Sequence, residues 1–224
     1  MPHFDIVRKC DVVNTFRVSK IRADFDVQPD KANEHFVGNI ELPENWKIGV
    51  IYGGSGTGKS TIAKELFGDK VVDKFEYSAA SVIDDIKANS VDDIVKAFYA
   101  VGFGSVPSWL KPYSVLSNGE KMRVDLARAL LERDFVCFDE FTSVVDRQVA
   151  QTACIAINKA MQKTNKKFVA ISCHSDILEW LQPDWAFNTD EMRSFFSIAH
   201  DQKNSMKLNA AGVESGQSLS VITI

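Results

Sequence analysis

The chain has 224 residues, enough for one substantial α/β domain or two small ones with a sizeable buried core. Its net charge of −4 and pI near 5.6 provide no general attraction to nucleic acid or acidic lipid. No apolar run approaches the roughly 18 residues of a membrane-spanning helix, and residues 1–5 do not resemble a signal peptide. We therefore expect a cytoplasmic protein without direct membrane insertion, and nucleic-acid binding is not supported.

Four cysteines are spread along the chain, without a Cys-x-x-Cys pair or a His/Cys cluster that would indicate a structural metal. Cys137 and Cys173 fall in apolar runs that are typical of buried strands. Together with Cys10 and Cys154, they are expected to be reduced thiols of the core, as in a cytosolic protein.

Residues 4–42 alternate polar and apolar side chains, which is typical of antiparallel strands with one face in water. The pattern predicts strands at residues 4–7, 16–27 and 36–42, with a polar turn at residues 28–31. The apolar run at residues 48–52 predicts a further, buried strand.

A glycine-rich loop follows this buried strand and leads into a predicted helix at residues 60–67. Its glycines allow successive backbone N–H groups to turn inward on a phosphate, and the helix N-terminus adds partial positive charge. Lys59 would reach the β- and γ-phosphates, and Ser60 would hold Mg²⁺. The alternative is an ordinary glycine-rich turn that ends in Lys-Ser. The predicted phosphate-binding residues are Gly53, Gly54, Ser55, Gly56, Thr57, Gly58, Lys59, Ser60 and Thr61.

The next part of the chain mixes helix and loop signals. Residues 71–77 form a short apolar stretch, and residues 90–101 predict an amphipathic helix capped by Ser90. Residues 102–113 hold too many Gly and Pro residues for regular structure. They predict an ordered loop that is packed by its aromatic side chains.

The stretch Ser117-Asn118-Gly119-Glu120 precedes a predicted helix at residues 121–133. Ser-x-x-Glu before a helix is a capping box, in which the serine and the glutamate satisfy free N–H groups of the first turn. This structural interpretation is sufficient for the stretch taken alone. An acidic strand end follows it, and that order favours a functional role as well.

Residues 135–138 form an apolar strand that ends in Asp139 and Glu140. A carboxylate at the carboxyl end of a buried strand can bind the Mg²⁺ that Ser60 also contacts, and the next carboxylate can deprotonate an attacking water. Asp139 is thus a predicted metal ligand and Glu140 a predicted general base. The alternative is an acidic pair that is merely solvated.

Two more polar residues mark the ends of later elements. Asp146 precedes a predicted helix from residue 147 to about residue 162, and a strand at residues 168–173 leads to His174. A single histidine at a strand end is more often structural than catalytic. Its place in this order of motifs reverses that preference.

These motifs, in this order, resemble those of the ATP-binding cassette (ABC) ATPases between residue 36 and about residue 185. Residues 53–60 look like Walker A, residues 116–120 like the signature loop and Asp139-Glu140 like Walker B with its catalytic glutamate. Asp146 looks like the D-loop and His174 like the switch histidine. The resemblance implies ATP and Mg²⁺ as ligands, with Lys59, Glu140 and His174 as catalytic residues and Ser117, Asn118, Gly119, Glu120 and Asp146 at the nucleotide.

The resemblance also implies the fold: an α/β P-loop NTPase of ABC type with a mixed sheet core. An N-terminal antiparallel β-subdomain and a reduced helical subdomain, about residues 78–130, complete it. The ATPase domain is expected to span residues 1–190. Residues 191–224 are expected to form a tail that is either flexible or docked on a partner.

Three segments are similar to a narrower group, the soluble ABC ATPases fused to or associated with a GNAT-like acetyltransferase domain. These segments are residues 107–112, 139–147 and 173–180. The similarity implies an acetyltransferase domain, or another protein, as a partner. The sequence leaves open whether the chain is a piece of such a fusion.

Several positions depart from the ABC pattern. Asn118 and Glu120 stand where the family commonly has glycine and glutamine, and no glutamine lies between residues 61 and 115. The family's Q-loop residue, which senses Mg²⁺ and the lytic water, therefore has no counterpart. Phe16, Phe25 and Phe36 compete as the residue that stacks on adenine. Phe25 is preferred, although a core role suits each of them.

The implied function is ATP hydrolysis in a head-to-tail homodimer, in which Ser117 and Gly119 of one subunit face the γ-phosphate held by Lys59 of the other. ATP would close the dimer and hydrolysis would reopen it, which makes the protein a conformational switch. One alternative is a weakly hydrolysing nucleotide sensor that regulates an acetyltransferase or another partner. A transporter energy subunit, which the reduced helical subdomain disfavours, and a DNA-repair ABC ATPase are the others.

Overall fold

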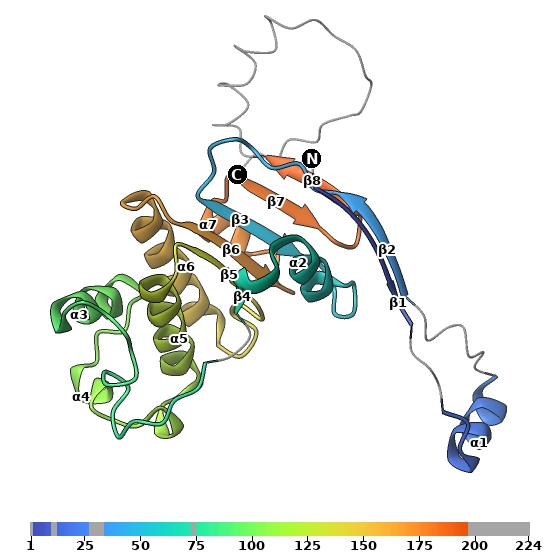
Figure 1. The fold of residues 1–224 in the computed structure, drawn as a ribbon, viewed down its shortest axis with the longest axis horizontal. Coiled ribbons are helices and arrows are strands. Elements are labelled where there is room, and N and C mark those ends of the chain that lie inside the picture. Colours follow the sequence, from blue (N-terminus) through green and yellow to red (C-terminus); the bar gives the residue numbers. More distant parts are fainter. Residues whose placement is uncertain (1, 10–12, 27–33, 73–74, 197–224) are drawn as a thin grey trace, which may run out of the picture.

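A computed structural model describes residues 2–9, 13–26, 34–72 and 75–196 (Figure 1). Its centre is a six-stranded sheet in the order β4-β5-β6-β3-β7-β8. The first five strands of this order run parallel, and β8 pairs antiparallel with β7. The strands are β3 (Ile48–Tyr52), β4 (Val71–Val72), β5 (Phe135–Phe138), β6 (Lys167–Ser172), β7 (Trp185–Asn188) and β8 (Arg193–Phe196).

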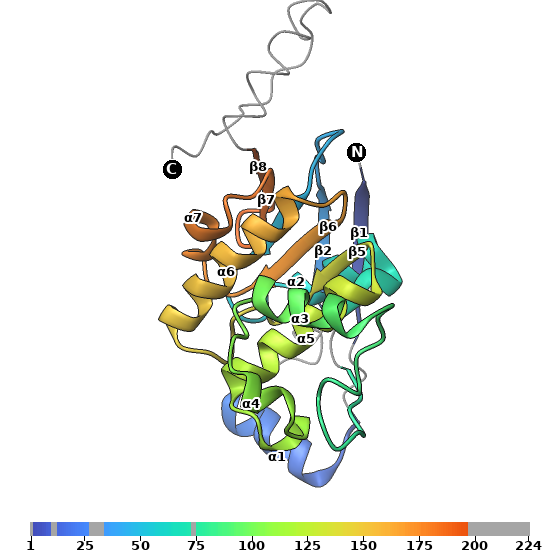
Figure 2. The same ribbon diagram turned by 90° about the vertical axis from the view of Figure 1, so that its left-hand side faces the viewer.

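Helices cover both faces of the sheet and enclose two apolar cores (Figures 1 and 2). On one face lies α2 (Lys59–Phe67), which is followed by the short helix η2 (Gly68–Lys70). The other face carries α5 (Asn118–Glu132), α6 (Arg147–Gln162) and α7 (Ile177–Leu181). Because side chains alternate along a strand, Val50 belongs to the core under α5 and α6, and Ile51 to the core under α2. Both faces are therefore closed, which explains the almost continuous apolar strands.

The N-terminal strand β1 (His3–Arg8) pairs antiparallel with β2 (Glu34–Asn39), so two of the three predicted N-terminal strands are confirmed. Phe4 anchors this pair to the main sheet, since its ring meets Phe187 edge to face at 6.0 Å. The pair extends away from the sheet as a two-stranded arm (Figure 1).

The predicted strand at residues 16–27 is wrong, because the structure forms helix α1 (Phe16–Phe25) there. Thr15 caps this helix, and its hydroxyl accepts a hydrogen bond from Val18 N at 3.3 Å. A strand would need a partner, but β1 and β2 pair with each other. The polar turn predicted at residues 28–31 lies outside the described residues.

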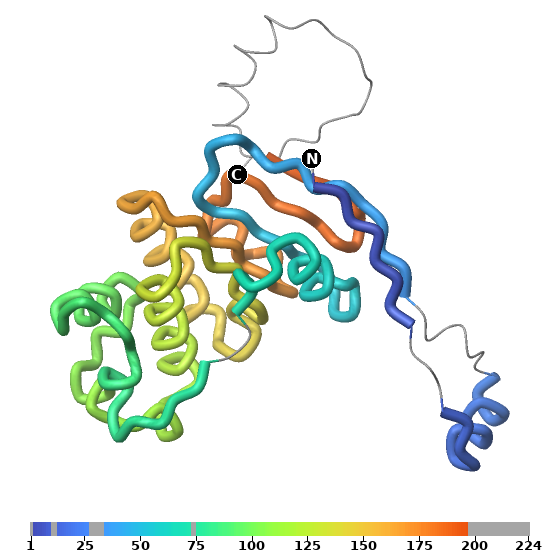
Figure 3. Tube along the Cα trace, in the orientation of Figure 1, coloured from blue at the N-terminus to red at the C-terminus, as the bar shows by residue number. Residues whose placement is uncertain are grey.

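Residues 78–117 of the predicted helical subdomain wind in loops and short helices beside α5, which holds the rest of the predicted range (Figure 3). The helix capped by Ser90 is confirmed as α3 (Val91–Ala100), and Ser90 Oγ accepts from Asp93 N. The loop predicted at residues 102–113 is packed by its aromatics, as expected: Trp109 is buried and its indole N–H donates to the Phe103 carbonyl. Two short helices within it were not predicted, α4 (Val106–Trp109) and η3 (Tyr113–Val115), which reaches just past the loop.

The cysteines divide by their place relative to the strands. Cys137 and Cys154 are buried, and burial raises the pKa of the Cys154 thiol to about 12. Cys173 is exposed, so the prediction of a core thiol is wrong there. Its apolar run ends at Ser172, the last residue of β6, and Cys173 lies beyond the covered sheet. Cys10 is outside the described residues.

At the C-terminal end of the described chain, the β7–β8 hairpin extends the sheet to Phe196. The predicted domain boundary at residue 190 therefore falls in the turn of this hairpin. Among the described helices, none is both long enough and apolar enough to cross a bilayer.

Candidate functional site

The glycine-rich loop connects β3 to α2, as the sequence predicts, and places its polar groups around the start of the helix. Gly56 and Gly58 adopt φ of +82° and +83°, in the region that favours glycine. A Cβ atom on Gly58 would lie only 2.6 Å from the Phe36 ring, so the loop rests on this core aromatic. Phe36 is therefore a core residue of the loop's support. Lys59 Nζ donates to the carbonyls of Gly53 (3.1 Å) and Gly54 (2.6 Å).

Ser60 and Asp139 lie together at the carboxyl ends of β3 and β5. The Ser60 hydroxyl donates to Asp139 Oδ1 at 2.9 Å, and the same oxygen accepts from Glu140 N at 2.9 Å. A hydroxyl and a carboxylate are ligands that suit Mg²⁺, which completes its shell with water and substrate phosphates. Among the described residues no group of three or more His, Cys, Asp or Glu side chains forms a denser metal site. The donor pair therefore fits a metal that is bound together with a phosphate.

The turn after β5 has a strained backbone. Glu140 and Thr142 adopt φ of +53° and +66°, which is uncommon for residues other than glycine and costly for a β-branched one. Phe141, between them, is fully buried, and its N–H donates to the Ile171 carbonyl of β6 at 2.8 Å. This anchoring leaves the Glu140 side chain exposed at the edge of the sheet that also holds Asp139. Sequence reasoning missed the left-handed backbone at Thr142, because such a conformation leaves no mark in the residue pattern.

The signature stretch forms the predicted capping box. Ser117 caps α5, its hydroxyl accepting from Glu120 N, while Glu120 Oε2 accepts from Ser117 N at 2.9 Å. The second Glu120 oxygen accepts from the Ser108 hydroxyl at 2.7 Å, a contact that the sequence did not predict. The Ser108 hydrogen bond is the main reason that the pKa of Glu120 lies below its ordinary value. Ser117 and Asn118 are exposed, and we call residues 108 and 117–120 the signature cluster.

Asp146 and His174 lie in two segments that a single arginine connects. Asp146 caps α6 by accepting from Val149 N at 2.9 Å, and a Cβ atom on Gly119 would lie 3.3 Å from Val149, so α6 begins beside the signature cluster. Arg147 forms a bidentate ion pair with Asp176, and its guanidinium lies over the Trp180 ring at 5.2 Å.

The histidine itself is held mainly through its backbone, since His174 N donates to Ser172 Oγ at 3.1 Å. Its ring lies beside the Cys173 thiol, 3.5 Å from Sγ to Nδ1. The side chain is half-buried, at the carboxyl end of β6. The structure thus places His174 just beyond the end of β6. This strand lies between β3, which leads into the glycine-rich loop, and β5, which leads to Asp139.

Residues 53–60, Asp139, Thr189 and Asp190 form a second connected group, which we call the P-loop cluster. The last two residues join it from the turn after β7, because Asp190 accepts from Gly54 N and Thr189 contacts Thr57. Within the described part of the chain, no hydrogen bond or ion pair joins the P-loop cluster to residues 117–120. Residues 53–60 and Asp139 are therefore brought together as one group and residues 117–120 as another, while Asp146 and His174 lie outside both.

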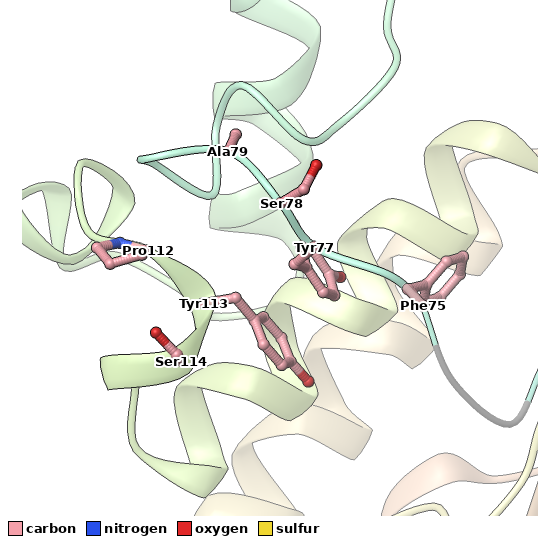
Figure 4. Close-up of a pocket in the computed structure, with 7 residues that line it drawn as sticks. All are labelled: Phe75, Tyr77, Ser78, Ala79, Pro112, Tyr113 and Ser114. Atoms are coloured by element: carbon pink, nitrogen blue, oxygen red, sulfur yellow. The ribbon is translucent and has the colours of Figure 1, made fainter.

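A third polar group braces the region before α5 and borders a cavity of about 430 Å³ (Figure 4). The rings of Tyr77 and Tyr113 stack 3.9 Å apart, and their hydroxyls donate to the two oxygens of Asp125, each at 2.7 Å. The Arg128 guanidinium lies over the rings of Phe75 and Tyr77. Burial raises the pKa of Asp125 and of both tyrosines, although the two hydroxyls and Arg128 favour the charged carboxylate.

No family model matches this sequence. A protein of Haemophilus influenzae described as an uncharacterized ABC transporter ATP-binding protein is 27% identical over 197 residues, covering 75% of this chain and 69% of that protein. A bacterial ABC transporter cassette solved as a dimer superposes with a TM-score of 0.54 at 15% identity, covering 69% of this chain and 87% of that one. The chain cbiO1 of Clostridium perfringens, described as part of an ABC transporter complex, superposes with a TM-score of 0.56 at 19% identity, covering 79% of this chain and 86% of that one.

The chain therefore has the α/β P-loop fold of an ATP-binding cassette, which confirms the predicted fold class with its antiparallel N-terminal strand pair. The Haemophilus relative supports the resemblance to the ABC ATPases, and the superposed cassettes support the fold. They give no support to the association with an acetyltransferase domain that three sequence segments suggested.

Proposed function

We propose that the protein binds ATP with Mg²⁺ and hydrolyses the bond between its β- and γ-phosphates. The observation that carries this proposal is the hydrogen bond from Ser60 to Asp139, next to a glycine-rich loop at a helix N-terminus. Both residues offer oxygen atoms at a point where the phosphates of a bound nucleotide would lie. A bound Mg²⁺ would neutralise charge on the β- and γ-phosphates there.

The chemical roles follow from the position of each side chain. Residues 53–61 would surround the phosphates with backbone N–H groups, and Lys59 would exchange its loop carbonyls for the β- and γ-phosphate oxygens. Glu140, exposed beside Asp139, would take a proton from the attacking water. His174 follows β6, the strand next to β5, and would contact the γ-phosphate as the charge on that phosphate changes.

The proposed active form is a head-to-tail dimer. The signature cluster is exposed at Ser117 and Asn118, and within the described residues no hydrogen bond or ion pair joins residues 117–120 to the P-loop cluster. A second copy would supply residues 117–120 and Asp146 to the nucleotide, which accounts for the separation of the two groups. One superposed cassette was solved twice as a dimer, the second time in a post-hydrolysis state with ADP and phosphate, and both structures support a dimeric form.

Light scattering combined with phosphate release tests this proposal. Glu140→Gln keeps the shape of the site but removes the base, so this variant should form a dimer with ATP and Mg²⁺ and release no phosphate. Asn118→Arg in the Glu140→Gln background places a bulky charge on the exposed signature residue and should abolish the dimer while ATP still binds. A Glu140→Gln variant that stays monomeric with ATP and Mg²⁺ would contradict the head-to-tail dimer.

The absence of a glutamine between residues 61 and 115 favours a second candidate, a nucleotide sensor that hydrolyses weakly. Such a sensor would gate a partner through binding alone. Tight ATP binding with no turnover, or a steady-state rate that Glu140→Ala leaves unchanged, would establish the sensor over the hydrolytic switch.

The printed description of the Haemophilus relative favours a third candidate, the energy-supplying subunit of a membrane transporter. Against this role, residues 75–117 form only short helices, and such a reduced helical subdomain offers a smaller docking surface to a membrane partner than a full-length one would. Expression with an affinity tag, followed by mild detergent extraction, would decide this point. Recovery of a stoichiometric membrane protein would support the transporter role.

A further inference from the structure

We propose that Thr189 and Asp190, in the turn between β7 and β8, are positioning residues that hold the glycine-rich loop in its phosphate-binding shape. This inference rests on the proposed nucleotide site and adds to it two residues that no sequence motif marks. Both belong to a turn more than a hundred residues downstream of the loop, which meets the loop because β7 pairs with β3. The two residues act on different loop positions and can be tested separately.

Asp190 fixes the second residue of the loop. Its two carboxylate oxygens accept from Gly54 N at 3.1 and 2.9 Å. On the other side of the same residue, the Gly54 carbonyl accepts from the Thr57 hydroxyl at 2.9 Å and from Lys59 Nζ at 2.6 Å. When Lys59 turns to a phosphate, Asp190 and Thr57 are the groups that keep Gly54 oriented.

Thr189 fixes the residues on both sides of Gly54. It is a buried polar residue, 2% exposed, whose hydroxyl lies 2.5 Å from the Thr57 hydroxyl. Its N–H and its hydroxyl both donate to the Tyr52 carbonyl, at 2.8 and 3.2 Å. A Cβ atom on Gly53 would lie 2.2 Å from Thr189 Oγ1, so the threonine closes directly against the start of the loop.

The turn bonds to the N–H group of Gly54 and to the Thr57 hydroxyl, and it leaves other amide N–H groups of the loop available to a phosphate. Among the described residues, the amide N–H groups of Ser55, Gly56 and Gly58 have no acceptor within the chain. A loop already held in one conformation does not lose conformational entropy when the phosphate binds, so preorganisation increases affinity. Release of either contact should therefore weaken the binding of a nucleotide rather than slow the chemical step.

Titration of ADP with Mg²⁺ against the full-length chain, with the melting temperature measured in parallel, tests this inference. Asp190→Ala removes the acceptor for Gly54 N and should raise the Kd for ADP about tenfold, while Asp190→Asn keeps an acceptor oxygen and should stay within about threefold of wild type. Thr189→Val removes the hydroxyl and should raise the Kd similarly, while Thr189→Ser should restore it. In turnover assays the loss should be in KM, with kcat within about threefold.

The outcomes separate this inference from the proposed function. If wild type binds neither ADP nor ATP, both fail. If wild type binds and Asp190→Ala and Thr189→Val bind with unchanged Kd, the positioning role is overturned and the proposed function stands. A lower melting temperature with an unchanged Kd also overturns it. Should Thr189→Val fail to fold, Asp190→Ala decides, because Asp190 is exposed and contributes little to the core.

Discussion

The P-loop cluster and the signature cluster are built in opposite ways. The P-loop cluster joins residues from three distant parts of the chain, which meet because β5, β3 and β7 run parallel in one sheet and their carboxyl ends share one edge. The signature cluster is local, since Ser108, Ser117 and Glu120 lie within one short stretch and hold each other through a helix cap. One cluster thus depends on the sheet and the other on a single helix end, and they should fail independently.

The replacement Lys59→Ala should break the P-loop cluster with the largest effect. It removes the only ammonium in the glycine-rich loop, so ATP hydrolysis should fall at least about 100-fold, which corresponds to roughly 3 kcal/mol. The melting temperature should change little, because Lys59 donates only to loop carbonyls that Thr57 and solvent can also satisfy. Phosphate release and a thermal melt measure the two effects. Lys64→Ala, on the exposed side of the same helix, is the matched control and should retain full activity.

The replacement Asp125→Ala should do the reverse, and break the support of α5 while leaving the P-loop cluster intact. It deprives the hydroxyls of Tyr77 and Tyr113 of their acceptor, and the free energy of unfolding should fall by roughly 2–4 kcal/mol. For a chain of this size, the melting temperature would fall by roughly 5–15 °C.

Tyr113→Phe provides a graded control, because it removes one donor and leaves Asp125 with the other. Its loss of stability should be less than half that of Asp125→Ala. Below the melting temperature, the Kd for ADP should stay within about threefold of wild type in both variants. A large rise in Kd would show that the two clusters are coupled through α5 and do not fail independently.

Sequence reasoning succeeded where the chemistry is contiguous or repeats the order of a known family. The glycine-rich loop, the Ser117 cap and the strand that ends at Asp139 were all readable, because local spacing determines each of them. It failed where a contact depends on strand order. Thr189 and Asp190 reach the loop only because β7 pairs with β3, and nothing in their local sequence indicates it.

The other errors have the same origin. The alternation at residues 16–27 predicted a strand, yet a strand needs a partner, and the local cap at Thr15 favoured a helix instead. Cys173 belongs to an apolar run, but the sheet ends one residue earlier. In both cases the sequence pattern was real, but it does not show whether a neighbouring strand or helix lies there to pair with or cover the segment.

The smallest predicted effect is a pH dependence of stability that belongs to the signature cluster alone. The hydrogen bond from Ser108 holds the pKa of Glu120 below its ordinary value, so ionised Glu120 stabilises the folded state above about pH 4.3, and this contribution is lost as the pH falls through the lower, folded-state pKa. Glu120→Gln keeps the capping box but cannot titrate. Its free energy of unfolding should therefore fall less steeply than that of wild type as the pH decreases from about 5 to 3.

Because Glu120 is only partly buried, solvent screening limits the difference between the two proteins to less than about 1 kcal/mol. Urea unfolding at several pH values measures it, and Ser108→Ala should reduce the pH dependence in the same direction, since it removes the main cause of the lowered pKa. The Kd for ADP of a single chain should show no matching change at these pH values in Glu120→Gln relative to wild type, because no polar contact connects Glu120 with the P-loop cluster among the described residues. If the free energy of unfolding depends on pH equally in wild type and Glu120→Gln, the charge of Glu120 adds nothing to stability beyond the hydrogen bonds of the cap. Ser108 then has no electrostatic role.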